Sequence, residues 1–105
     1  MMSMEPYKVV FDSLEWQAPM PGTRFKVFSD GLKQLRLVEF TSEFVEPQWC
    51  EKGHIGIVLQ GELEIDFHGR HVHYPEGAGI FISPANGHKA RSVTPRVLLF
   101  LVEDA

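Results

Sequence analysis

The sequence predicts a single all-β domain, folded as a sandwich or small barrel, over residues 1–105. Many short apolar or alternating segments follow one another, separated by clusters of Gly, Pro, Asn and Asp. Nine glycines and seven prolines fall mostly between these segments. No window of about 11 residues combines the apolar spacing of an amphipathic helix with freedom from Gly and Pro. With 44% hydrophobic residues, the chain can build one packed core.

The first part of the chain is expected to start loosely over 1–6 and to form a short strand over 7–11. The segment 12–22 is expected to be a loop anchored by Trp16, because two prolines and a glycine interrupt it. Polar and apolar residues then alternate over 23–28, which is the period of a half-buried strand.

The Ser-Asp-Gly turn at 29–31 predicts a hairpin between 23–28 and a second strand at 32–40. The remaining expected strands, each bounded by turn residues, are 54–59, 62–67, 72–74, 79–83, 88–93 and 96–102. The run 97–102 is apolar at every position, which is typical of a strand buried on both faces, either between sheets or at a subunit contact.

Charge and hydropathy exclude several classes of partner. Ten basic and fourteen acidic residues give a formal charge of −4 without a basic cluster, so neither nucleic acid nor an anionic membrane surface is expected to bind. A membrane span needs about 20 apolar residues, far more than the run 97–102 offers. The first residues lack the pattern of a signal peptide, and a single cysteine suits a reducing compartment. We therefore expect a cytoplasmic protein.

The stretch EPQWCEKGHIGIVLQG at 46–61 carries the residues that suggest a functional site. In a straight strand each residue advances about 3.3 Å, so Cys50 and His54 would lie roughly 13 Å apart. The chain must bend for them to meet, and Gly53 suits a bend because glycine tolerates positive φ. Gln48 shares a face with Cys50, so all three side chains converge if both faces point inward.

This spacing resembles the first motif of the cupin superfamily, H-x-H-x(3,4)-E-x(6)-G. Gly61 aligns with the closing glycine, and His54 then stands where the family has its glutamate. Cys50 and Gln48 fall on the two histidines.

The second cupin motif, G-x(5)-P-x-G-x(2)-H-x(3)-N, aligns with a stretch that ends at Ser92. Pro84 and His88 fit its proline and histidine, and Gly87 is one residue late for its glycine. Ala78 and Ser92 replace the leading glycine and the asparagine. The resemblance covers about half of the chain.

The resemblance implies a small cupin, a jelly-roll β-barrel of two antiparallel sheets that often forms homodimers. It also implies a metal site at Gln48, Cys50, His54 and His88, of which only His88 keeps the family's residue type. A thiolate and imidazoles favour Zn, Fe, Ni or Cu over Mg or Ca, and Gln48 suits a supporting or substrate contact. No nucleotide cofactor is expected.

Three functions remain open at this point. A bound metal would favour an enzyme acting on a small organic molecule, such as an isomerase or dioxygenase. The same pocket would suit a metal-free binding or sensing module, or a structural domain in which Cys50 is a small buried hydrophobe. A Cys50–His54 nucleophilic dyad is a further alternative.

Other residues have simpler interpretations. Four apolar residues are candidates for a pocket lining, although they also suit an ordinary core: Phe40, Val58, Phe81 and Phe100. His71 and His73 share a strand face, so they could bind a metal at the surface. A solvated hairpin with no role is the simpler interpretation.

Overall fold

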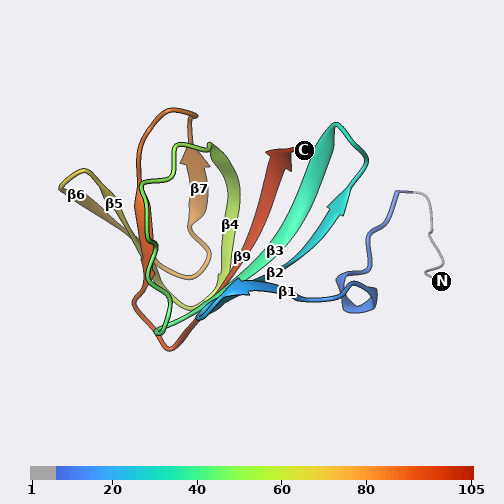
Figure 1. Ribbon diagram of the computed structural model, residues 1–105, viewed down its shortest axis with the longest axis horizontal. Helices are drawn as coiled ribbons and strands as arrows, with labels where there is room; N and C mark the ends of the chain where they lie inside the picture. Colours follow the sequence, from blue (N-terminus) through green and yellow to red (C-terminus); the bar gives the residue numbers. More distant parts are fainter. Residues whose placement is uncertain (1–6) are drawn as a thin grey trace.

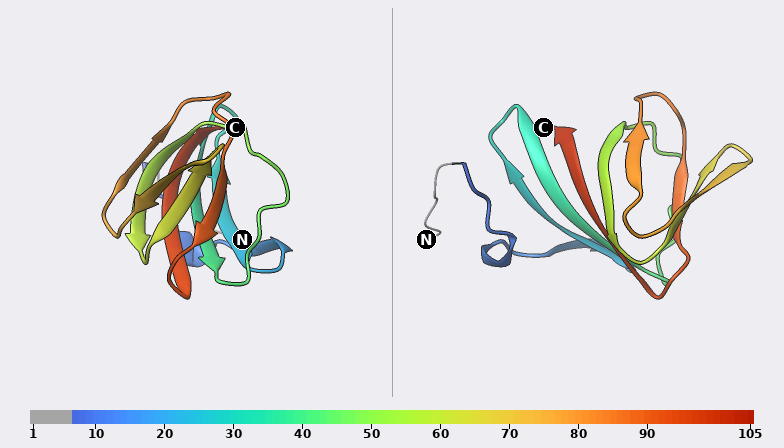
Figure 2. Two further views of the ribbon diagram at one scale, coloured as in Figure 1. Left: turned by 90° about the vertical axis from the view of Figure 1, so that its left-hand side faces the viewer. Right: turned by 180° about the vertical axis from the view of Figure 1, so that it is seen from behind.

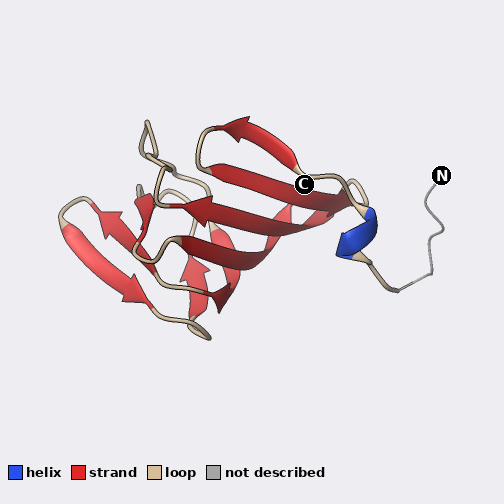
Figure 3. Ribbon diagram, turned by 90° about the horizontal axis from the view of Figure 1, so that it is seen from below, coloured by secondary structure: helices blue, strands red, loops and turns tan. Residues whose placement is uncertain are grey.

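The computed structural model describes residues 7–105, which contain nine β-strands and one turn of 3-10 helix. The strands are β1 (Gln17–Met20), β2 (Thr23–Ser29), β3 (Lys33–Thr41), β4 (His54–Gln60), β5 (Leu63–Phe67), β6 (Arg70–Tyr74), β7 (Gly79–Ile82), β8 (Lys89–Ser92) and β9 (Arg96–Asp104). The described residues form no α-helix, and the blue segment in Figure 3 is the 3-10 turn, so the predicted all-β class is confirmed. Across this range no helix is long and apolar enough to span a lipid bilayer.

The strands pair in two antiparallel sheets. The larger sheet has the order β1-β2-β3-β9-β4-β7, and the smaller one has the order β6-β5-β8. The sheets converge at one end and diverge at the other, and they do not close into one hydrogen-bonded barrel (Figure 1). The C-terminus lies beside the turn between β2 and β3, where the Ala105 N–H donates to the Leu32 carbonyl at 3.1 Å (Figure 2).

Two expectations about the first twenty-two residues were wrong. Residues 7–11 form no strand, because Phe11–Ser13 turns as a 3-10 helix (η1) and the Ser13 hydroxyl donates to the Val10 carbonyl. The expected loop at 12–22 contains β1, which pairs with β2. Proline is tolerated at an edge strand with an irregular register, so Pro19 did not prevent pairing. Residues 1–6, expected to be loose, lie outside the described residues.

The core lies between the two sheets, and β9 illustrates how the sequence builds it. Alternate residues of β9, namely Val97, Leu99 and Leu101, are buried against the core, and Glu103 continues the same inward face. The other buried core residues are Val38, Val58, Leu63, Ile65, Ile80 and Ile82. The apolar run 97–102 is therefore the centre of the larger sheet, paired with β3 and β4.

The outer face of the larger sheet is partly covered by the N-terminal segment. The ring of Phe11 packs edge-on against Phe100 at 6.2 Å, and its carbonyl accepts a hydrogen bond from Lys26 Nζ. Trp16 lies under the Arg24 guanidinium at 4.1 Å, which confirms its anchoring role. Farther along this face, an outer strip of Ile55, Ile57, Phe81 and Val102 stays exposed.

Glu39 on this outer face is expected to make stability depend on pH. Its carboxylate accepts hydrogen bonds from Arg24 Nε at 2.6 Å and Arg96 Nε at 2.5 Å. The Arg24 hydrogen bond lowers the pKa of Glu39 below its ordinary 4.5, against the opposing effect of burial. A lowered folded-state pKa means that the ion pairs stabilise the fold above the ordinary pKa and lose this effect as pH falls below it.

We therefore expect Glu39→Gln to reduce the free energy of unfolding by about 1 kcal/mol at neutral pH, with a smaller difference near pH 3. Urea titrations of both proteins at several pH values measure this. The exposed Glu43 supplies a matched control, because Glu43→Gln removes a carboxylate that is not part of the Glu39 ion pairs. A Glu39→Gln effect of the same size at pH 3 would contradict the assignment.

Candidate metal centre

Two loops at the open end of the sheets and the first residue of β4 carry the predicted site residues. Cys50 and His88 form an isolated antiparallel bridge, in which each N–H donates to the other's carbonyl at 2.9 Å. The Ala85 N–H also donates to the Glu51 carbonyl at 2.8 Å. The loop before β4 is thereby fixed to the loop before β8, although the two are far apart in sequence.

The expected bend between Cys50 and His54 exists, but the reason given for Gly53 was wrong. The glycines with positive φ among the described residues do not include Gly53. A side chain there is excluded by packing instead, because a Cβ would lie 2.8 Å from the Ile82 carbonyl oxygen and 2.9 Å from Pro84 Cδ. Glycine thus allows this loop to approach the β7 end closely.

Three of the four predicted ligands converge. Cys50, His54 and His88 each offer one ligand atom, and these atoms lie within 4.8 Å of one another. The Cys50 Sγ to His54 Nε2 distance is 4.0 Å, and the two imidazole rings lie 5.2 Å apart at 77°. His88 is 3% exposed, whereas Gln48 is exposed on the loop surface, and its role stays a prediction.

Hydrogen bonds fix the same tautomer in both histidines. His54 Nδ1 lies 2.8 Å from Glu103 Oε2, and His88 Nδ1 lies 2.9 Å from the Asn86 carbonyl oxygen. A carboxylate and a carbonyl can only accept, so each Nδ1 carries the proton. In the neutral form of each ring, Nε2 then carries the lone pair, which is how imidazole binds a metal while its other nitrogen is held by an acceptor.

Glu103 supports His54 from a buried position that sequence reasoning missed. Its side chain is 1% exposed and accepts hydrogen bonds from Arg36 Nε at 2.7 Å, Arg36 Nη2 at 2.9 Å and Gln34 Nε2 at 3.0 Å. Burial alone would raise the pKa of Glu103, but the hydrogen bonds from His54 and Arg36 lower it well below its usual range. The sequence did contain a sign of this role, because Glu103 follows Val97, Leu99 and Leu101 at two-residue spacing and so shares their buried face of β9.

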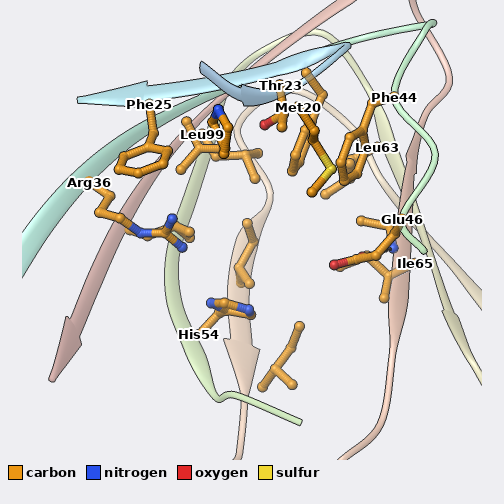
Figure 4. Close-up of a pocket in the computed structure, with 17 residues that line it drawn as sticks. Met20, Thr23, Phe25, Arg36, Phe44, Glu46, His54, Leu63, Ile65 and Leu99 are labelled. Atoms are coloured by element: carbon orange, nitrogen blue, oxygen red, sulfur yellow. Dashed lines mark hydrogen bonds between the residues drawn. The ribbon is translucent and has the colours of Figure 1, made fainter. Parts of the chain in front are cut away.

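A cavity of about 200 Å³ lies between the sheets and shares His54 with this cluster (Figure 4). Most of its wall is apolar, with Phe25, Phe44, Leu63 and Ile65 among the lining residues. Arg36, Glu46 and His54 are its ionisable lining groups, and Figure 4 shows them around the same space. Such a mainly apolar pocket with a few polar groups is typical of small-molecule sites.

The four residues offered as pocket lining or as ordinary core take different positions. Phe40 lines the cavity. Phe81 is 79% exposed and Phe100 packs on Phe11, so both face outward. Val58 is buried in the core. His73 pairs with Glu62 at 2.7 Å and is exposed, which agrees with a solvated hairpin.

The comparisons with known proteins bear on the fold. No protein-family model matches the sequence, and no curated protein matches it. Among solved structures, KdgF from Halomonas sp. has a TM-score of 0.74 and 21% identity, over 90% of this chain and 91% of that one. An RmlC-like cupin from Shewanella frigidimarina has a TM-score of 0.75 and 15% identity, over 98% and 94%.

Hydroxypropylphosphonic acid epoxidase from S. wedmorenis is also similar, with a TM-score of 0.73 and 14% identity. The match covers 90% of this chain and 57% of that longer one. The structurally similar proteins include several cupin-domain proteins, so the resemblance noted in the sequence is confirmed at the level of the fold. The chain has a cupin-like jelly roll with a candidate metal-binding triad.

Proposed function

We propose that Cys50, His54 and His88 bind a divalent transition metal, and that the adjacent cavity binds a small organic molecule. The observation that carries the proposal is the convergence of one thiol and two imidazoles whose Nδ1 atoms are already engaged. One sulfur and two nitrogen donors suit Zn²⁺, Fe²⁺, Ni²⁺ or Cu²⁺ and do not suit Mg²⁺. Three protein ligands also leave a coordination position for water or substrate.

A metal held there would act as a Lewis acid on a ligand in the cavity. The residues of the chain have separate tasks. Glu103 keeps the proton on His54 Nδ1, and the apolar wall excludes water from the bound molecule. An isomerase or dioxygenase-like activity would use these features, and a binding or sensing module would need only the pocket.

The test is the metal content of protein purified without an affinity tag. We expect near-stoichiometric Zn, Fe, Ni or Cu in the native protein and a loss of more than tenfold in Cys50→Ala and His88→Ala. His73→Ala is the matched control, because it removes an exposed histidine outside the triad. Metal content is measured by mass spectrometry, and circular dichroism confirms that each variant is folded.

A native protein that stays metal-free after incubation with these ions would overturn the metal proposal. The pocket would then be a metal-free ligand site or part of a structural domain. Retention of metal in Cys50→Ala and His88→Ala would instead move the site elsewhere.

A Cys50–His54 nucleophilic dyad is a second candidate, favoured by the Glu103 carboxylate behind His54. Cys50 would be the nucleophile, His54 the base and Glu103 the group that orients the base, as in a catalytic triad. The 4.0 Å distance from Cys50 Sγ to His54 Nε2 exceeds the roughly 3 Å needed for proton transfer. Fast alkylation of Cys50 that depends on His54 in metal-free protein would favour this candidate.

We also propose a homodimer, which the exposed outer strip on β4, β7 and β9 supports, since oligomer interfaces are often apolar. The absence of nucleic-acid partners and the cytoplasmic location stay predictions from charge and from the single cysteine.

A further inference from the structure

Arg36 has one hydrogen-bonding edge that its partner leaves open. Glu103 engages Nε and Nη2, which form the side-on edge of the guanidinium. A guanidinium carries five N–H donors in a planar fork, so the end-on edge at Nη1 and Nη2 can bind a second carboxylate. Arg36 lines the cavity, and Figure 4 shows its guanidinium on the side that also carries His54.

The other walls of the cavity define the body of the ligand. Phe25, Phe44, Leu63 and Ile65 present apolar surface. The cavity volume of about 200 Å³ exceeds the roughly 150 Å³ of an engineered cavity that holds benzene. A ring or branched chain with one additional small group therefore matches the available space.

The charges around the cavity favour a single anionic group at the Arg36 end. Arg36 and Lys52 both form ion pairs with Glu103, and the distance from Lys52 Nζ to Glu103 Oε1 is 3.5 Å. With a divalent metal on a Cys50 thiolate, the positive charges at this end outnumber the negative ones. Glu46 lines another part of the cavity, and one of its oxygens accepts the Ala90 N–H at 2.8 Å. A second anionic group on the ligand would meet Glu46 or the apolar wall.

We propose that the cavity binds a small monocarboxylate with an apolar body, whose carboxylate is held by the end-on edge of Arg36 beside the metal site. This inference rests on the proposed function, because the bound metal supplies part of the positive charge. Glu46 acts as a specificity determinant that disfavours dicarboxylates.

Three matched probes test the ligand class by isothermal titration calorimetry on zinc-loaded and on chelator-treated protein. Benzoate is expected to bind at least tenfold more tightly than its neutral analogue benzamide, in both preparations and more strongly with zinc. Terephthalate, which adds a second carboxylate to the same ring, is expected to bind at least tenfold more weakly than benzoate.

Two variants assign the effects to residues. Arg36→Lys keeps a positive charge for Glu103 but loses the planar fork, so benzoate affinity should fall at least tenfold while benzamide affinity is unchanged. Glu46→Gln, which leaves Arg36 and Glu103 in place, should improve terephthalate binding several-fold. Arg24→Lys is the control on the outer face and should change neither affinity.

The outcomes separate this inference from the metal proposal. Zinc binding without a preference for benzoate, or a preference that survives Arg36→Lys, would overturn the carboxylate site and leave the metal site standing. An Arg36-dependent preference in a protein that takes up no metal even after incubation with zinc would support the carboxylate site and overturn the metal proposal. If Arg36→Lys does not fold, an unchanged terephthalate affinity in Glu46→Gln would still contradict the assignment.

Discussion

Glu103→Ala should destabilise the fold by about 3–5 kcal/mol, because removing one partner of a buried ion pair leaves the other without compensation. Arg36 is only 20% exposed and would keep its charge without the carboxylate that accepts two of its hydrogen bonds. Gln34 and His54 would lose the same acceptor. Urea denaturation at neutral pH measures the difference.

The effect of Glu103 on the metal site is best measured in Glu103→Gln, which keeps the shape of the side chain. The amide oxygen is a weaker acceptor for His54 Nδ1, so zinc affinity should fall about 10–100-fold, as is common for residues behind a metal ligand. The neighbouring Asp104 is the control, because its side chain is 83% exposed and pairs only with the exposed Lys33 among the described residues. Asp104→Ala should change stability by less than about 1 kcal/mol and leave zinc affinity unchanged. Equal zinc affinity in the native protein and in Glu103→Gln would show that Glu103 does not support metal binding.

Gly56→Ala should reduce the free energy of unfolding by about 3 kcal/mol or more, above the usual range for overpacking. A Cβ at this position would lie 1.9 Å from the Phe100 carbonyl oxygen and 2.9 Å from Leu101 Cδ2. The first contact is with backbone, so β4 and β9 would have to separate in the middle of the larger sheet.

Gly79→Ala is the matched control for this effect. Gly79 lies in β7, next to β4, and a Cβ there would have no atom within 4 Å. Its replacement should change stability by less than about 1 kcal/mol, in the stabilising direction if chain entropy dominates. Thermal unfolding of both variants makes the comparison. Similar stability for the two variants would contradict this prediction, because it would mean that β4 and β9 adjust to a Cβ at position 56 at little cost in free energy.

The sequence predicted the strands whose signal is local. The alternation at 23–28 and the turn at 29–31 both belong to neighbouring residues, and β2 and β3 form the expected hairpin. The strand β1 was missed because its pairing with β2 decides it and Pro19 weakens the local signal. The strand expected at 7–11 was wrong although its residues have a local strand pattern. Phe11 begins a 3-10 turn and packs against Phe100, and the segment does not join the sheet.

The same distinction explains the candidate site. Cys50, His54 and His88 were predicted as a group because the two motifs carry their spacing and resemble a known pattern. Glu103 lies in β9 near the C-terminus, and Arg36 lies in β3. Only the pairing of β9 with β3 and β4 brings both residues to His54. No local pattern contains that register.

Because the bridge between Cys50 and His88 joins two loops, metal binding there should restrict the motion of both loops. An ion held by these residues would act as a cross-link between two loops that are far apart along the chain, in the manner of a disulfide. Loop opening at 50–53 and 83–88 would then require release of the ion. Metal occupancy would slow amide hydrogen exchange in these two loops, including the N–H groups of Cys50, Ala85 and His88 that join them.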